Sequence, residues 1–200
     1  MPDTADLVIR NATIVDGSGG PAMRGGLAVA GGRILAVGDL PEVAGAQEID
    51  AGGHVLCPGF IDVHTHAENI VYHAKAENFL RMGVTTLVLG NCGSSKLDIG
   101  QFFDRMSQFG FSPNIASLIG HGTVRNQVMG SSMRRPPTKE ELKHMQQLIT
   151  KAMEDGALGM STGLIYLPGT FAKTDELIAL AKTVSKHENC TMFEFTSTKV

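Results

Sequence analysis

Two histidines separated by one residue are the first side chains in this sequence that could bind a metal. His64 and His66 follow residues 60–63, a mainly apolar segment that reads as a short strand entered from a Pro58-Gly59 turn. Side chains at positions i and i+2 of an extended backbone point the same way, so both imidazoles project from one face. Together they would form half of a divalent-metal site. The alternative is a solvated loop with two histidines. The carboxyl end of an apolar strand, where parallel α/β folds keep their chemistry, favours the metal site.

A cysteine follows the next strand and is a candidate third ligand. Cys92 lies in the Gly-Asn-Cys-Gly segment at residues 90–93, directly after residues 84–89, a strand rich in β-branched and apolar residues without any charge. In a parallel sheet this strand end lies beside the two histidines, and sulfur combined with imidazole favours zinc over magnesium or manganese. The alternative is a buried structural cysteine. His121 also ends a strand, and it either lines the site or is a hydrogen-bonded structural histidine.

The remaining cysteines are interpreted as core residues. Cys57 and Cys190 lie inside apolar segments. Three scattered cysteines do not form a disulfide framework, which indicates a reducing cytoplasmic location.

Short β-strands fill the segment before Pro58. Residues 27–30 and 33–37 flank Gly31-Gly32 and predict a hairpin, and residues 47–50 and 53–56 predict a second one around Gly52-Gly53. We expect residues 1–57 to form a small β-domain that acts as a scaffold.

From Pro58 onward strands and helices alternate, which is typical of a parallel sheet. Strands are predicted at residues 60–63, 84–89, 114–119, 157–161 and 190–195, and helices at residues 74–82, 100–108, 138–156 and 174–187. Thr138 with Glu141 fits a capping box, and Thr174 is the predicted cap of the last helix. Residues 58–200 are therefore expected to form an α/β unit, part of a TIM (β/α)8 barrel.

Five strands and four helices are fewer than a closed barrel needs, because such a barrel takes about 250 residues. Either the other half of the barrel comes from another chain, or this chain is a truncated form of a longer protein, and we expect truncation. Unpaired strand edges predict that the isolated chain self-associates.

Composition narrows the possible partners. The 200 residues are 42% hydrophobic and 18% charged, with a net charge of −3, which describes a globular protein without a basic nucleic-acid or membrane surface. No apolar run approaches the roughly 20 residues of a membrane helix, and the first residues do not resemble a signal peptide.

Several segments, taken together, carry a family resemblance. Residues 58–66, Pro-Gly-Phe-Ile-Asp-Val-His-Thr-His, resemble the first-strand signature of the amidohydrolase superfamily, metal-dependent hydrolases on TIM barrels. Residues 79–86, 90–93, 120–125 and 156–166 resemble its N-acyl-D-amino-acid deacylase (D-aminoacylase) branch. The match runs in order from about Asp6 to His187.

The resemblance implies a zinc-dependent hydrolase that cleaves the amide of a small-molecule N-acyl-D-amino acid. It assigns zinc to His64, His66 and Cys92, and it makes Tyr166, in the Thr-Gly-Leu-x-Tyr segment, a substrate contact. In the family zinc acidifies a bound water and polarises the acyl carbonyl, with an aspartate as general base. That aspartate and the later histidine ligands would lie beyond Val200, so the chain alone is expected to be inactive. The segment at residues 193–200 departs from the family's histidine-containing fifth strand.

Two alternatives stay open. A cyclic-amide hydrolase of the hydantoinase or dihydroorotase kind would carry a carboxylated lysine on the fourth strand, and no lysine occurs between Gly156 and Phe171. A non-catalytic fragment that binds a partner is the second alternative.

Overall fold

The computed structural model of the chain describes residues 4–40, 43–187 and 192–196. The chain folds into two compact units, Met1–Gly59 and Phe60–Val200. Each unit is described by itself.

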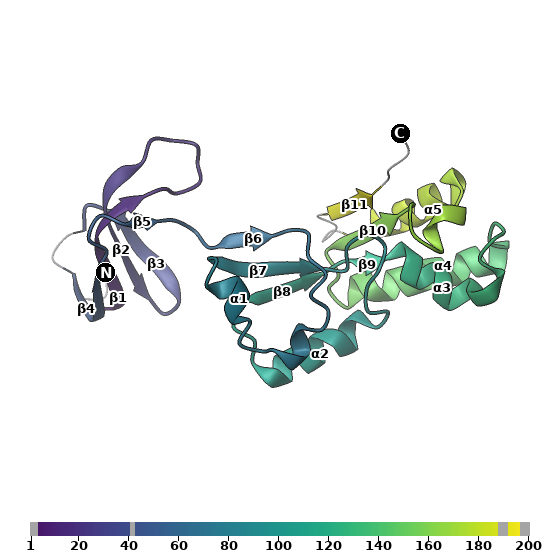
Figure 1. Ribbon diagram of the computed structural model, residues 1–200, viewed down its shortest axis with the longest axis horizontal. Helices are drawn as coiled ribbons and strands as arrows, with labels where there is room; N and C mark the ends of the chain where they lie inside the picture. Colours follow the sequence, from purple (N-terminus) through teal and green to yellow (C-terminus); the bar gives the residue numbers. More distant parts are fainter. Residues whose placement is uncertain (1–3, 41–42, 188–191, 197–200) are drawn as a thin grey trace. The chain divides into compact units, whose positions relative to one another are not determined.

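The N-terminal unit is a five-stranded sheet. Its strands are β1 (Thr4–Ile14), β2 (Met23–Ala30), β3 (Arg33–Gly38), β4 (Ala44–Asp50) and β5 (Val55–Leu56). The order is β3-β2-β1-β4, and β5 also pairs with β1 (Figure 1). The predicted β2–β3 hairpin is confirmed. Gly31 and Gly32 take φ values of 56° and 71°, so these two residues allow the tight reversal that pairs Ala30 with Arg33.

The second predicted hairpin, around Gly52-Gly53, is wrong. Strands β4 and β5 both pair in parallel with β1, at successive positions along the same strand. The connection keeps hydrogen bonding to β1, because Ala51 N donates to Arg10 O at 2.9 Å and Gly53 N donates to Asn11 O at 2.7 Å. The two glycines therefore interrupt one long partner of β1 and do not reverse the chain.

The second unit alternates strands with helices and short 3-10 turns. Its strands are β6 (Phe60–Asp62), β7 (Val84–Leu89), β8 (Asn114–Ser117), β9 (Ile119–Gly120), β10 (Gly159–Gly163) and β11 (Met192–Thr196). Its helices are α1 (Glu77–Leu80), α2 (Ile99–Phe109), α3 (His121–Met129), α4 (Lys139–Glu154) and α5 (Thr174–Val184), with 3-10 turns at Ile70–Tyr72, Gly130–Ser132 and Gly169–Phe171.

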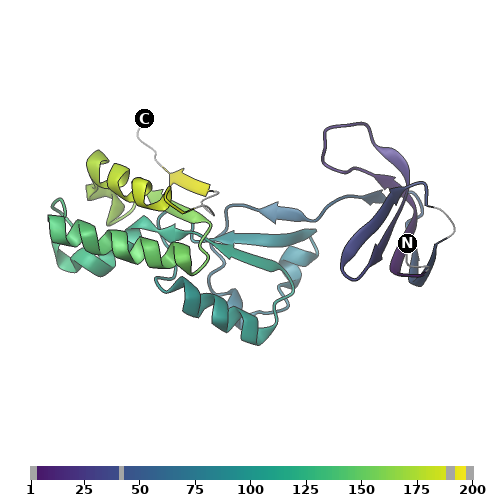
Figure 2. The same cartoon turned by 180° about the vertical axis from the view of Figure 1, so that it is seen from behind.

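All strand pairs described in this unit are parallel. One sheet has the order β6-β7-β8 and the other has the order β9-β10-β11 (Figures 1 and 2). The strand predicted at residues 114–119 is split at Leu118, so β8 pairs with β7 while β9 pairs with β10. Parallel strands joined through helices confirm the predicted α/β class.

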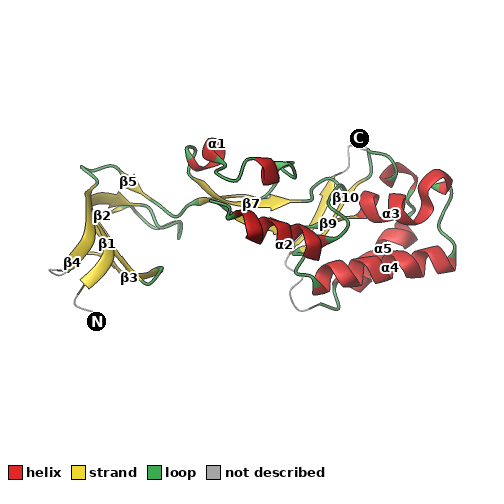
Figure 3. Ribbon diagram, turned by 90° about the horizontal axis from the view of Figure 1, so that it is seen from below, coloured by secondary structure: helices red, strands yellow, loops and turns green. Residues whose placement is uncertain are grey.

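Helix α4 agrees with its sequence signals. Thr138 Oγ1 accepts a hydrogen bond from Glu141 N at 3.2 Å, and Glu141 Oε2 accepts one from Thr138 N at 2.7 Å. These two bonds form the predicted capping box. Figure 3 shows α4 beside α5, and Gln146 Nε2 donates to Thr183 Oγ1 at 3.1 Å between them. The buried apolar cluster to which α4 and α5 contribute includes Ile119, Met145, Ile149, Met153, Met160, Leu180 and Val184.

Two helix predictions need correction. The helix expected at residues 74–82 is reduced to the single turn of α1, because Ala76 stands at its N-cap with φ 46° and no side-chain hydrogen bond. Helix α3 was not predicted. Gly122 and the β-branched residues of this helix are weak helix formers, and burial of Val124, Arg125 and Met129 stabilises it instead.

The core assignment of Cys57 is also wrong, and that of Cys190 lies outside the described residues. Cys57 is exposed in the connection between β5 and β6, where Pro58 lacks the N–H that would continue a strand ladder. No helix in the described part of the chain combines the length and the apolar character of a membrane span.

Candidate metal centre

Three donor side chains meet where β6 and β7 end. His64 and His66 follow β6, Cys92 follows β7, and these strands are parallel neighbours. One ligand atom from each residue lies within 4.8 Å of the other two. The Cys92 Sγ is 3.3 Å from His64 Nε2, and the two imidazole rings stand edge to face with centroids 5.5 Å apart. The structure therefore brings together the three residues that the sequence singled out.

Two hydrogen-bonding side chains connect the histidine segment to the cysteine turn. The buried Asn91 donates from Nδ2 to Thr65 O at 3.2 Å and to Val88 O at 2.8 Å. Glu68 Oε1 accepts a hydrogen bond from Gly90 N at 3.1 Å. Thr65 lies between the two histidines, so Asn91 fixes the spacing of the two halves of the cluster.

Neither Asn91 nor Glu68 was predicted to have a role. For Asn91 a signal was present: an amide side chain in a glycine-bounded turn satisfies nearby backbone groups. For Glu68, only the three-dimensional contact reveals the role.

The donor set fits a zinc ion. Two imidazoles and one thiolate are ligands that zinc accepts, and three protein ligands with an open position are typical of catalytic zinc. Both histidines are exposed and Cys92 is partly buried, so the cluster is open on one side. A ligand could therefore approach a bound ion directly.

A cavity of about 600 Å³ adjoins the cluster and is bordered by His66 and Cys92. Tyr166, Leu167 and Pro168, from the loop after β10, also line it. The remaining described lining residues are Gly93, Ser94, Gly122, Thr123, Asn126, Met133, Gly163 and Gly169. This volume falls within the range of small-molecule sites. Tyr166, which the sequence proposed as a substrate contact, thus shares a cavity with two of the donors.

His121 is a structural residue and does not border this cavity. It is fully buried, its Nδ1 lies 2.8 Å from Thr162 Oγ1, and its Nε2 lies 2.9 Å from Glu176 Oε1. Arg125, also fully buried, pairs with the other oxygen of Glu176 and donates to Met133 O at 2.8 Å. Burial raises the pKa of Glu176, but the hydrogen bonds and charges of His121 and Arg125 outweigh it, so its pKa lies below the ordinary value. This network connects α3, α5 and β10.

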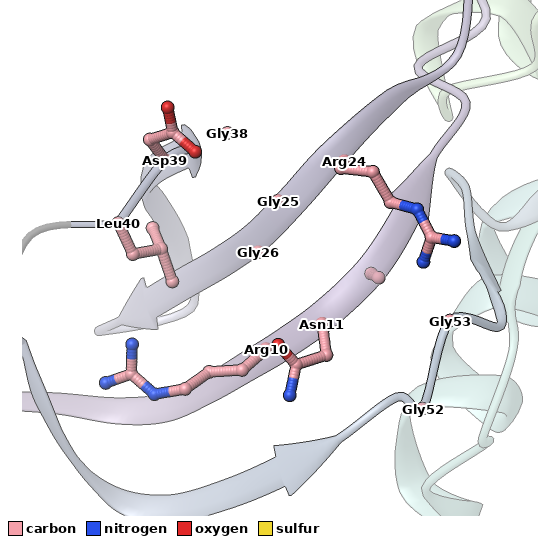
Figure 4. Close-up of a pocket in the computed structure, with 11 residues that line it drawn as sticks. Arg10, Asn11, Arg24, Gly25, Gly26, Gly38, Asp39, Leu40, Gly52 and Gly53 are labelled. Carbon is pink, nitrogen blue, oxygen red and sulfur yellow. The ribbon is translucent and has the colours of Figure 1, made fainter.

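A second cavity, of about 560 Å³, lies in the N-terminal unit (Figure 4). Its described lining is largely glycine and backbone, with Arg10 and Arg24 at opposite ends. Arg10 is already bound to Glu48 and to Val43 O. The described lining holds neither histidine nor cysteine, so the arrangement offers no comparable metal chemistry.

Comparison with known proteins identifies related sequences. The sequence profile of the Amidohydrolase family matches residues 47–189. The N-acyl-D-aspartate deacylase of Alcaligenes xylosoxydans xylosoxydans is 38% identical over 201 aligned residues, covering 88% of this chain and 40% of that protein. The D-aminoacylase of the same organism is 37% identical, covering 91% of this chain and 42% of the relative. This chain therefore spans about two fifths of the length of these relatives.

Part of a solved deacylase structure also resembles this chain's fold. The N-acyl-D-glutamate deacylase of Bordetella bronchiseptica, complexed with zinc and a phosphonate inhibitor, superposes with a TM-score of 0.86 at 33% identity. The match covers 92% of this chain and 43% of that one.

Proposed function

The chain belongs to the amidohydrolase family, and we propose that it supplies metal ligands and part of the substrate cavity of a zinc-dependent N-acyl-D-amino-acid deacylase. The observation that carries this proposal is the convergence of His64, His66 and Cys92 beside the cavity that Tyr166 borders. The names of the deacylase relatives support the substrate class, and the zinc complex of the Bordetella enzyme supports the metal.

The residues of this chain have distinct parts in the proposed reaction. His64 and His66 as neutral imidazoles and Cys92 as a thiolate would hold the metal, and Asn91 ties the histidine segment to the cysteine turn. A zinc ion held there would supply Lewis-acid chemistry, polarising the amide carbonyl and lowering the pKa of water. Tyr166, Leu167 and Pro168, which line the cavity beside His66 and Cys92, would contact the substrate. Water adds across the C–N bond, and a carboxylate and a free D-amino acid result.

The donor cluster of the described residues contains no carboxylate. The general-base aspartate that the family resemblance implies therefore has to come from outside this cluster. For this reason we propose that the 200-residue chain alone hydrolyses N-acyl-D-amino acids poorly or not at all.

The proposal extends to the fold. We propose that residues 58–200 are an incomplete (β/α)8 barrel and that residues 1–57 are part of a small β-domain. The two parallel sheets and the division after Gly59 support this proposal. The cytoplasmic location stays a prediction from the cysteine content.

A cyclic-amide hydrolase is less well supported. Strand β10, Gly159–Gly163, is the fourth strand of the expected barrel, and it contains no lysine that could be carboxylated. A non-catalytic fragment is the remaining alternative, and the experiment below separates it from the enzyme.

The test is a chimera assayed beside the chain itself. Residues 1–184 of this chain, ending with α5, would replace the matching part of the Alcaligenes D-aminoacylase. We expect zinc-dependent hydrolysis of N-acetyl-D-amino acids and not of the L-enantiomers, and its loss on Cys92→Ala. The 200-residue chain should show little turnover. A folded, zinc-loaded chimera without activity would contradict the proposal, as would turnover of about 1–10³ per second by the chain alone.

A further inference from the structure

The turn that carries Cys92 has an unusual backbone. Gly90, Cys92 and Gly93 have φ values of 79°, 55° and 77°, all in the left-handed region. Glycine adopts this region freely, but a residue with a Cβ does so only when its surroundings hold it there. Cys92 is therefore placed by contacts from outside the turn.

A single hydroxyl group supplies two of these contacts. Ser161 lies in β10 and is fully buried. Its Oγ donates to Gly90 O at 2.5 Å and accepts a hydrogen bond from Gly93 N at 2.9 Å. Because Gly90 and Gly93 flank Asn91 and Cys92, this hydroxyl closes the turn across its base.

Strand β10 also approaches the turn two residues later. A Cβ added to Gly163 would lie 2.3 Å from the carbonyl oxygen of Cys92, and a Cβ added to Gly93 would lie 2.8 Å from Gly163 N. Residues at i and i+2 of a strand face the same side, so Ser161 and Gly163 both face the cysteine turn. The backbone of β10 and the turn therefore leave space for a hydroxyl at residue 161 and for no side chain at residue 163.

We infer that Ser161 is a positioning residue for the metal ligand Cys92. Its hydroxyl holds the turn in the conformation that points the thiol toward His64 and His66. This inference rests on the proposed function, because it assumes that Cys92 is a ligand. Metal-binding groups are oriented by hydrogen-bonding partners around them, and loss of such a partner typically lowers metal affinity roughly 10- to 100-fold.

The experiment is a Co²⁺ titration of the 200-residue chain, followed by the near-ultraviolet thiolate-to-cobalt absorption band. Ser161→Ala removes the hydroxyl. Ser161→Thr and Ser161→Val form a matched pair, because the two side chains have the same shape and differ in the hydroxyl. Ser117→Ala is the control at another buried serine, whose Oγ donates to the neighbouring Leu118 O. Cys92→Ser shows which part of the band belongs to Cys92 and not to another cysteine.

We expect Ser161→Ala and Ser161→Val to weaken Co²⁺ binding roughly 10- to 100-fold and to diminish the thiolate band. Ser161→Thr and Ser117→Ala should stay close to the unmodified chain. Thermal melts of the metal-free variants measure folding separately. Equal affinity and an equal band in Ser161→Thr and Ser161→Val would overturn the inference while the metal site stands. Unfolding of both variants that lack the hydroxyl, with Ser161→Thr folded, would also overturn it by showing a general folding role.

Failure of the proposed function would look different. In that case the unmodified chain would show no thiolate band that Cys92→Ser removes, whatever residue stands at position 161.

Discussion

At the scale of single residues, the candidate site depends on side chains that do not themselves reach the metal. His64 and His66 come from one strand end and Cys92 from another, and the structure connects these ends through Asn91. Its amide group donates to two carbonyl groups, Thr65 O and Val88 O, so its two N–H bonds are both used. The arrangement of the three candidate ligands thus involves the Asn91 side chain as well as the ligands themselves.

This arrangement predicts the effect of Asn91→Asp. An ionised aspartate has the shape of asparagine but only accepts hydrogen bonds, so it would face two carbonyl oxygens without a donor. We expect a loss of about 1–3 kcal/mol in the free energy of unfolding of the metal-free chain, measured by urea denaturation. Asn69→Asp makes the same change at an exposed position and serves as the control. Equal stability of the two variants would show that the Asn91 bonds contribute little.

At the scale of secondary structure, local signals are most reliable where they specify a backbone group. The capping box of α4 contains both reciprocal bonds that its sequence predicts. Thr138→Ala should therefore cost about 0.5–2 kcal/mol of unfolding free energy, measured by urea denaturation. Thr174→Ala is the control, because the structure puts Lys173 at the N-cap of α5 and finds no side-chain cap there. The sequence had assigned that capping role to Thr174, which is wrong. A Thr138→Ala variant no less stable than Thr174→Ala would contradict this account.

The alternation of strands and helices could be predicted from the sequence. The ends of β7 at Val84 and Leu89 could be predicted too, because an uncharged, β-branched segment is flanked directly by Gly83 and Gly90. Helix α3 could not, since its stability comes from burial of Val124, Arg125 and Met129 and not from helix propensity. The parallel pairing of β4 and β5 with β1 likewise joins residues far apart in the sequence. The Gly52-Gly53 pair indicates a turn but does not show which strand the flanking segments pair with.

The candidate metal site shows the same contrast between features that local sequence signals indicate and features that depend on long-range contacts. The donors at His64, His66 and Cys92 could be proposed from residue type and strand-end position. The turn sequence indicated that Asn91 would bond nearby backbone groups, but it did not identify Thr65 as a partner. The bond of Ser161 to Gly90 O joins segments 71 residues apart, and no local pattern marks such a pair.

The network of His121, Arg125 and Glu176 predicts a large loss of stability on Glu176→Gln. The substitution keeps the shape but leaves the buried Arg125 charge unpaired, which costs about 3–5 kcal/mol. Glu154→Gln, at an exposed position on α4, is the control. Urea denaturation measures both, and a Glu176→Gln variant as stable as the control would contradict a stabilising role for this network.

The network also has a pH dependence of defined sign. The pKa of Glu176 is lower in the folded chain than its ordinary value of 4.5. Its contribution to stability is therefore fully present above that value and is lost as the pH falls through the folded pKa. Glu176→Gln should lack this part of the acid destabilisation.

At the scale of the whole molecule, the exposed edge of β6 predicts self-association. Among the described residues β6 pairs with β7 alone, and Phe60, Ile61 and Val63 have exposed fractions of 58%, 61% and 54%. Apolar strand edges pair with other chains. We expect concentration-dependent oligomers in light scattering, reduced by Ile61→Lys. A monodisperse monomer with one sharp unfolding transition would contradict this expectation.

The most direct test of the central claim is zinc K-edge X-ray absorption of the zinc-loaded 200-residue chain. The account predicts one sulfur at about 2.3 Å and two imidazole nitrogens at about 2.0–2.1 Å from the zinc, with the sulfur contribution absent in Cys92→Ser. A spectrum fitted by nitrogen and oxygen alone, or one that Cys92→Ser leaves unchanged, would contradict the assignment of His64, His66 and Cys92 as a zinc centre.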